Sequence, residues 1–92
     1  MRIYELAATW EKPIMPHSPQ AGINSMASLH TYASIQNATR PHEFSGEFSG
    51  PLDEVADLYG DGVMPVNGKM HLSDKPGFGV ELNETAVARL TT

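Results

Sequence analysis

Apolar side chains recur at helical spacing in four stretches of the chain. The first covers residues 1–11 and is stopped by Pro13, which predicts the last turns of a helix. A looser stripe in an alanine- and serine-rich stretch predicts a second helix over residues 22–37. A third helix is expected over residues 51–58, opened by a proline and ended by two glycines. A final helical turn near the C-terminus has Asn83 as its expected cap.

Three further stretches have the pattern of extended backbone. Residues 13–16 form a short apolar run between prolines, which predicts a small buried strand with His17 just past its end. Residues 40–48 predict a second strand, since two phenylalanines favour extended backbone there. A hairpin is predicted over residues 63–72, because an Asn-Gly pair at its centre supplies both positive-φ residues of a type I′ turn.

The order of these elements predicts an α/β fold that gives way to an antiparallel tail. A helix between two strands implies that the strands are parallel. Two parallel strands leave both edges and one apolar face uncovered, and neighbouring units would normally cover them. The pattern therefore indicates one part of a larger fold.

Composition narrows the possible partners. The 92-residue chain has no cysteine, which excludes disulfides and thiolate metal sites. Its formal net charge of -5 leaves no basic stripe for nucleic acid or for an anionic membrane surface. The first ten residues lack the apolar run of a signal peptide, and no stretch is long enough to cross a bilayer. We therefore expect a cytoplasmic protein that binds neither nucleic acid nor membrane.

Four segments together resemble the mandelate racemase and sugar-acid dehydratase branch of the enolase superfamily. They are residues 13–18, 42–44, 65–68 and 75–81, and the Lys-Pro-Gly-Phe-Gly-Val-Glu sequence of the last one is the most recognisable. The resemblance implies the C-terminal fragment of a modified TIM (β/α) barrel, with its last two strands and the helix between them. On this basis residues 1–50 are the last βα units. Residues 51–92 are a C-terminal hairpin tail that returns to a capping domain.

The resemblance also implies roles for two residues at the ends of those strands. It makes His17 the general acid/base and Glu43 the acid that hydrogen-bonds the developing enolate. Glu47 is a rival for the second role, because it lies near the same strand end. The remaining histidines are interpreted as structural or surface residues. They are His30, His42 and His71.

The chemistry that the resemblance implies is removal of a proton next to a carboxylate. Such a site needs a base that is poised near neutral pH and a means of holding the negative charge of the enolate. The resemblance implies Mg²⁺ for the second task, bound by carboxylates from earlier strands that this chain does not contain. We therefore expect the chain alone to bind no metal and to be inactive, because it also lacks the second base of the family.

The function expected from the resemblance is part of a magnesium-dependent sugar-acid dehydratase that forms a 2-keto-3-deoxy acid. A racemase or epimerase of the same superfamily is the nearest alternative. A different alternative is a non-enzymatic fragment that associates through an exposed sheet edge. The expected partners are a sugar-acid substrate and either the rest of the barrel or other copies of the chain in a homo-oligomer.

Overall fold

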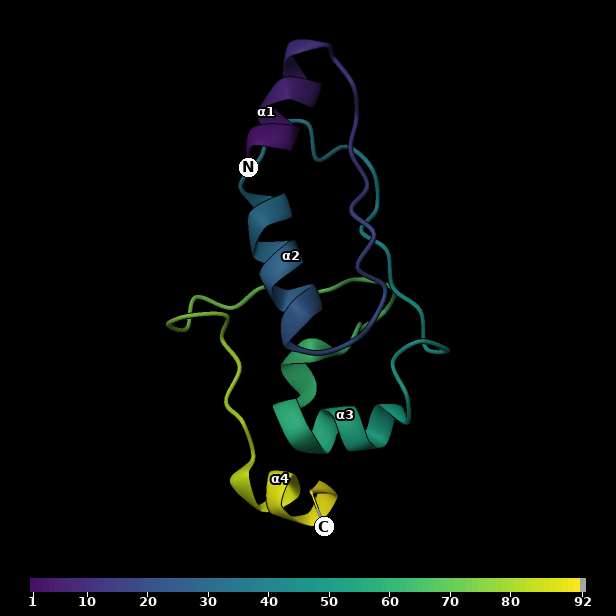
Figure 1. Ribbon diagram of the computed structural model, residues 1–92, viewed down its shortest axis with the longest axis vertical. Helices are drawn as coiled ribbons and strands as arrows, with labels where there is room; N and C mark the ends of the chain where they lie inside the picture. Colours follow the sequence, from purple (N-terminus) through teal and green to yellow (C-terminus); the bar gives the residue numbers. More distant parts are fainter. Residues whose placement is uncertain (92) are drawn as a thin grey trace.

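The computed structural model describes residues 1–91, and within that range the regular structure is helical (Figure 1). The elements in chain order are α1 (Arg2–Thr9), α2 (Ile23–Ala33), α3 (Leu52–Tyr59), the 3-10 turn η1 (Asp61–Val63) and α4 (Glu84–Leu90). The N-terminal helix and the C-terminal helix lie at opposite ends of an elongated molecule whose extents are 48 × 28 × 25 Å (Figure 1).

A small apolar core joins α2 to the segment after α3. Met26 and Leu29 of α2 pack with Val63 of η1, whose side chain is completely buried. Partly buried residues of α3 and of the following loop surround this cluster; they are Val55, Tyr59, Met64, Met70 and Val80. The core therefore depends on contacts between residues more than thirty positions apart in the chain.

The apolar stripe of α1 contributes nothing to this core. Ile3, Leu6 and Trp10 lie three and four positions apart, so they share one helical face. Their side chains are 78%, 63% and 68% exposed, and α1 has no buried residue. An amphipathic helix normally packs its apolar face against another element. Here that face is solvent-exposed.

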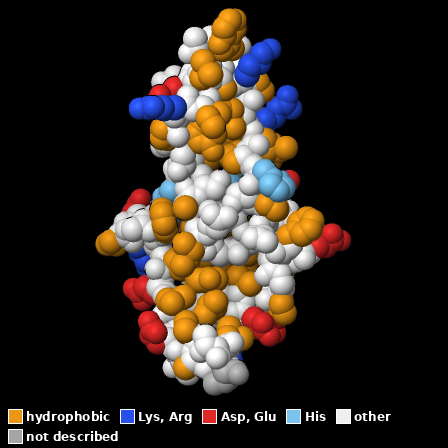
Figure 2. Space-filling model, in the orientation of Figure 1, with side chains coloured by type: hydrophobic (Ala, Val, Ile, Leu, Met, Phe, Trp, Pro, Cys, Tyr) orange, Lys and Arg blue, Asp and Glu red, His pale blue; other side chains and the backbone are white. Residues whose placement is uncertain are grey.

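The molecule as a whole exposes more surface than its size requires. A folded monomer of this mass is expected to expose about 5,200 Å², whereas this chain exposes 6641 Å². The radius of gyration is 14.6 Å, compared with about 12 Å expected for a compact chain of this length. Hydrophobic side chains accordingly reach the surface in several places (Figure 2).

The helix predictions are confirmed. The N-terminal helix and the alanine- and serine-rich helix form within the predicted ranges, and the helix after Pro51 extends one residue beyond its predicted end. Gly60 ends α3 with a φ of 78°, a conformation that glycine adopts without strain. Asn83 caps α4, because its side-chain oxygen accepts hydrogen bonds from the backbone N–H groups of Thr85 and Ala86.

The prediction of an α/β barrel fragment is wrong for the described residues. Residues 13–16 and 40–48 form no strand, and there is no sheet in residues 1–91. Pro13 and Pro16 remove two of the four backbone donors of residues 13–16, and Pro41 removes one of the nine of residues 40–48. The first segment therefore keeps only two donors for a ladder with the second.

The predicted hairpin is present only as its turn. Asn67 and Gly68 have φ angles of 50° and 74°, as a type I′ turn requires, and Val66 and Lys69 form one antiparallel bridge. The flanking strands expected over residues 63–72 do not continue beyond that bridge. Val63 instead belongs to η1, where it fills the core. The turn chemistry was predictable from two residues, whereas strands need a partner sheet.

The division of the chain at residue 50 stays a prediction. No helix in residues 1–91 has the length and apolar character that crossing a membrane requires.

Candidate active site

Two extended segments descend beside α2 in the same direction (Figure 1). The first follows α1 and the second follows α2, and polar contacts connect them at a nearly constant offset. The Tyr32 hydroxyl lies 2.6 Å from the Ile14 carbonyl oxygen and 2.7 Å from the Arg40 carbonyl oxygen. Further along, the Ser45 N–H donates to the Pro19 carbonyl at 2.8 Å. Residue 14 thus lies near residue 40, and residue 19 near residue 45.

The same offset places His17 beside Glu43. His17 Nδ1 lies 2.9 Å from Glu43 Oε2. The two residues were singled out separately from the sequence, and the structure brings them together although it forms no strand. The resemblance had placed them on neighbouring parallel strands, and the parallel course of the segments survives without the ladder.

The loop that carries His17 is anchored from below by α2. Ser25, in the first turn of α2, donates to the Ser18 carbonyl at 2.9 Å and also contacts the Gln20 carbonyl. Its hydroxyl lies 3.3 Å from the Ser18 hydroxyl, and both serines are buried. These contacts fix the backbone on the C-terminal side of His17.

The second loop is anchored to the first. The Ala21 N–H donates to the Ser49 hydroxyl at 2.8 Å, and that hydroxyl donates to the Ser45 carbonyl at 2.7 Å. A buried or half-buried backbone group needs such partners, since a group left without one costs about 1 to 3 kcal/mol. The loop from Glu43 to Ser49 is therefore held against the loop that carries His17.

The hydrogen bond to Glu43 has a consequence for the imidazole of His17. A carboxylate only accepts hydrogen bonds, so His17 Nδ1 carries the proton in the pair. In the neutral ring Nε2 is then unprotonated, and it makes no hydrogen bond to any described residue. The His17 side chain is 85% exposed and the Glu43 side chain 36% exposed. The pair therefore presents an accessible basic nitrogen to solvent.

A pocket of about 270 Å³ lies beside the loop that carries His17. It is lined by His17, Ser18, Pro19, Gln20, Asn24 and Phe48. Gln20 and Asn24 supply amide groups that can both donate and accept hydrogen bonds, and Phe48 supplies an apolar wall. A small polyhydroxylated molecule would find complementary groups here. Neither amide was predicted from the sequence, because each lacks a motif and acquires its place only when the loop folds onto α2.

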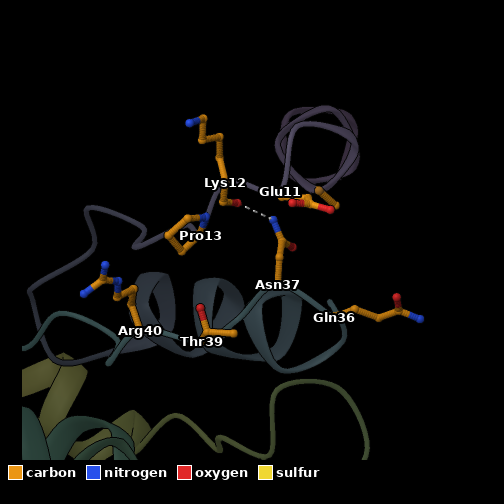
Figure 3. Close-up of a pocket in the computed structure, with 8 residues that line it drawn as sticks. Glu11, Lys12, Pro13, Gln36, Asn37, Thr39 and Arg40 are labelled. Carbon is orange, nitrogen blue, oxygen red and sulfur yellow. Dashed lines mark hydrogen bonds between the residues drawn. The ribbon is translucent and has the colours of Figure 1, made fainter.

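A larger pocket lies at the other end of α2 and has different chemistry. Its volume is about 470 Å³, and it is formed by the end of α1 and the loop after α2 (Figure 3). Asn37 spans part of it by donating to the Lys12 carbonyl at 3.1 Å. The Lys12 and Arg40 side chains extend away from the centre (Figure 3). No histidine lines this pocket, so it lacks the side chain whose ordinary pKa best suits proton transfer near neutral pH.

Of the other residues weighed from the sequence, Glu47, His30 and His71 form no ion pair or hydrogen bond with His17 or Glu43 among the described residues. Glu47 is exposed, and the carboxylate in the ion pair with His17 is that of Glu43. His30 Nε2 lies 3.4 Å from the Phe78 carbonyl, and His71 is exposed. Their surroundings fit the structural and surface roles that we expected of them.

Comparison with known proteins identifies the family. A model of the enolase C-terminal domain-like family matches residues 1–86. The chain belongs to this family. The resemblance found in the sequence is thereby confirmed.

One curated relative of this enolase-family chain is a D-galactonate dehydratase family member from Streptomyces bingchenggensis. It is 30% identical over 90 residues, which cover 96% of this chain and 21% of the relative. The chain thus spans about a fifth of the length of that relative. No solved structure matches this chain.

The enolase family raises the question of a metal, and the side chains of this chain do not fit one. Residues 1–91 contain no group of three or more histidine or acidic side chains that could hold a metal ion. Magnesium needs several oxygen ligands in octahedral geometry. Glu43, the acid at the site, already has one carboxylate oxygen on the imidazole of His17. The described residues therefore provide no magnesium site of their own.

Proposed function

We propose that this enolase-superfamily chain contributes the proton-transferring histidine of a sugar-acid dehydratase. The observation that carries the proposal is the His17–Glu43 pair, in which the carboxylate faces Nδ1 and leaves Nε2 available. The printed name of the curated relative, a D-galactonate dehydratase family member, supports the choice of reaction. The amide-lined pocket beside His17 supports a hydroxylated substrate.

The proposed reaction removes water from a 2,3-dihydroxy acid. A base takes the proton on the carbon next to the carboxylate, and the C–H electron pair enters the enolate. The enolate then expels the hydroxyl group on the next carbon, which leaves with a proton as water. The resulting enol becomes a 2-keto-3-deoxy acid. His17 can take the first proton through Nε2 or, once protonated, give a proton to the departing hydroxide.

Glu43 has two possible contributions in this scheme. The family resemblance assigns it a hydrogen bond to the developing enolate. The geometry supports a second contribution, because a carboxylate on Nδ1 fixes the tautomer of the ring and stabilises the imidazolium that forms. The first contribution places Glu43 at the reacting atoms, and the second acts through His17. In either case its replacement should lower the rate whichever step His17 performs.

Magnesium belongs to this proposal only through the family. We propose that a complete enzyme uses Mg²⁺ to hold the charge of the enolate, with ligands from residues other than those of this chain. No step proposed for His17 or Glu43 depends on the ion. The chain alone should accordingly be inactive, since it supplies one base and no metal ligand set.

A racemase or epimerase would use the same first step. It would return a proton to the opposite face of the same carbon instead of expelling hydroxide. The dehydratase is preferred because of the relative's name. A non-enzymatic fragment that associates through a sheet edge has lost its physical basis, since residues 1–91 contain no sheet.

The test is the replacement of His17 by asparagine in an enzyme that contains this chain as its C-terminal part. Loss of a positioned general acid/base should lower dehydration by about 10²-fold or more. Exchange of the substrate α-proton with deuterated solvent separates the two roles. Exchange and dehydration fall together if His17 is the abstracting base, whereas exchange persists if it only assists departure of hydroxide. His71→Asn is the matched control, because His71 is exposed and forms no ion pair with Glu43. A His17→Asn enzyme that dehydrates its substrate at the parent rate would refute the proposal.

A further inference from the structure

The residue before Glu43 has the most constrained imidazole in the described chain. His42 Nδ1 lies 2.8 Å from the Glu43 carbonyl oxygen, and its Nε2 lies 2.9 Å from the Ser28 hydroxyl of α2. The ring also meets the ring of Tyr32 edge-on, with centroids 5.8 Å apart and planes at 65°. Three independent contacts therefore fix the position and the orientation of this side chain.

The partners determine the tautomer of His42. A carbonyl oxygen only accepts hydrogen bonds, so Nδ1 must carry a proton to bond the Glu43 carbonyl. In the neutral ring Nε2 is then an acceptor, and the Ser28 hydroxyl donates to it. Ser28 is one helical turn from Tyr32. Both contacts of the ring beyond its own loop thus come from one face of α2.

The position of His42 matters because the pair beside it is exposed. An ion pair between solvent-exposed groups contributes little by itself, typically about 0 to 1 kcal/mol. Attraction between His17 and Glu43 therefore cannot be what holds the two loops in register. Their backbones must be fixed by other contacts. On the Glu43 side these are the hydrogen bond from His42, the hydrogen bond from the Ser45 N–H to the Pro19 carbonyl and the contact of Tyr32 with Arg40.

We propose that His42 is a positioning residue for the His17–Glu43 pair. It connects the carbonyl of Glu43 to α2, the same helix that anchors the His17 loop through Ser25. Helix α2 thereby serves as a common support on which both partners of the pair are placed. The functional meaning of this role rests on the proposed function, but the role itself is a statement about geometry in the chain alone.

The first test is the tautomer of each histidine in the 92-residue protein, read from nitrogen-15 NMR of the imidazole rings. The measurement is made at about pH 8.5, well above the ordinary imidazole pKa of about 6.5. In water the Nε2–H tautomer predominates, so the exposed His71 provides an internal reference. We expect His17 and His42 to show the opposite pattern, with the proton on Nδ1. His30, whose Nε2 faces a carbonyl, should resemble His71.

The second test replaces His42 and observes His17. His42→Phe keeps a ring against Tyr32 but removes both hydrogen bonds, and we expect the Nδ1–H preference of His17 to be lost. His42→Asn places an amide nitrogen where Nδ1 stood, so it can still donate to the Glu43 carbonyl and should retain much of that preference. His71→Phe is the control for removal of a histidine and should leave the His17 signals unchanged.

Two results would overturn the inference. One is a His42 ring in the parent protein that carries its proton on Nε2, a measurement that needs no variant to fold. The other is a His17 tautomer pattern that is the same in His42→Phe as in the parent. The fate of the proposed function is separate, because it is read from turnover after His17→Asn. Loss of the His17 pattern in His42→Phe together with undiminished turnover in His17→Asn would leave the positioning role standing and remove the catalytic one.

Discussion

The hydroxyl of Tyr32 offers the sharpest test of how the two segments are held in register. Tyr32 is 6% exposed, and its hydroxyl contacts the carbonyl of Ile14, the carbonyl of Arg40 and the N–H of Arg40, the last at 3.3 Å. Each contact lies three residues before a member of the His17–Glu43 pair. Replacement of Tyr32 by phenylalanine removes this connection and keeps the ring.

The size of the effect follows from these contacts. A hydroxyl has one proton, so at any moment it donates to one carbonyl and accepts from one N–H. Each hydrogen bond contributes about 0.5 to 1.5 kcal/mol, and a partner left buried costs more. Arg40 is exposed, so water can replace part of what it loses. We therefore expect Tyr32→Phe to lower the free energy of unfolding by about 2 kcal/mol, within a range of about 1 to 3 kcal/mol.

Urea unfolding followed by far-UV circular dichroism measures this change. For a small protein, whose unfolding free energy falls by about 1 kcal/mol per molar urea, the midpoint should fall by about 2 M. The melting temperature should fall by about 8 to 16 °C. Tyr59→Phe is the matched control, because the Tyr59 ring packs on the core but its hydroxyl bonds no described residue. It should change the free energy of unfolding by less than about 0.5 kcal/mol.

The result that would refute this reasoning is a Tyr32→Phe protein that unfolds at the parent urea concentration. The hydroxyl would then be replaceable by water at both segments. A destabilised variant whose His17 tautomer pattern is unchanged would limit the conclusion to stability, since the register of the pair would then depend on the serine contacts instead.

Four further outcomes are expected. Leu29→Ala should lower the free energy of unfolding by about 2 to 5 kcal/mol, because it opens a cavity against Val63 in a small core; a loss below 1 kcal/mol in urea titration would contradict that packing. Asn83→Ala should cost about 1 kcal/mol through loss of the α4 cap, and Asn83→Ser should restore most of it in the same titration. The exposed stripe of α1 should drive self-association, visible by sedimentation as a rise in mass with concentration and as a blue shift of Trp10 emission, and Leu6→Glu should abolish both. Calorimetry should detect no micromolar magnesium binding to the purified chain. A clear binding isotherm would contradict the absence of a cluster of metal ligands among residues 1–91.

The helices and the turn could be predicted because their signals are local. Spacing of apolar residues, a proline, a glycine and an Asn-Gly pair each act within a few residues. The absence of strands at residues 13–16 and 40–48 could not be predicted in the same way. Their extended course was correct, but a strand also requires a partner sheet, and prolines at positions 13, 16 and 41 remove some of the donors that a ladder would use. The sheet that apolar and aromatic composition favoured is thus absent from the described residues.

The candidate site was predictable only in part. His17 and Glu43 were found through a family resemblance, and their proximity in the structure follows from two parallel segments. His42 was interpreted as a structural or surface residue, and its contacts with Ser28 and Glu43 had no signal in the sequence. Such contacts depend on how a loop folds back onto α2, which a pattern of neighbours along the chain does not encode. The hydrogen-bond partners of the His42 ring are visible only in the folded structure.

The constant offset between the two segments makes the length of the intervening chain a functional quantity. Residues 14 and 40, 17 and 43, and 19 and 45 meet because 26 positions separate the members of each pair. One residue removed from the loop after α2 would bring Phe44 opposite His17, and no carboxylate would remain there. Many substitutions in that loop should be harmless, whereas a single insertion or deletion should separate the pair. The loop after α2 should therefore tolerate changes of residue type but not changes of length.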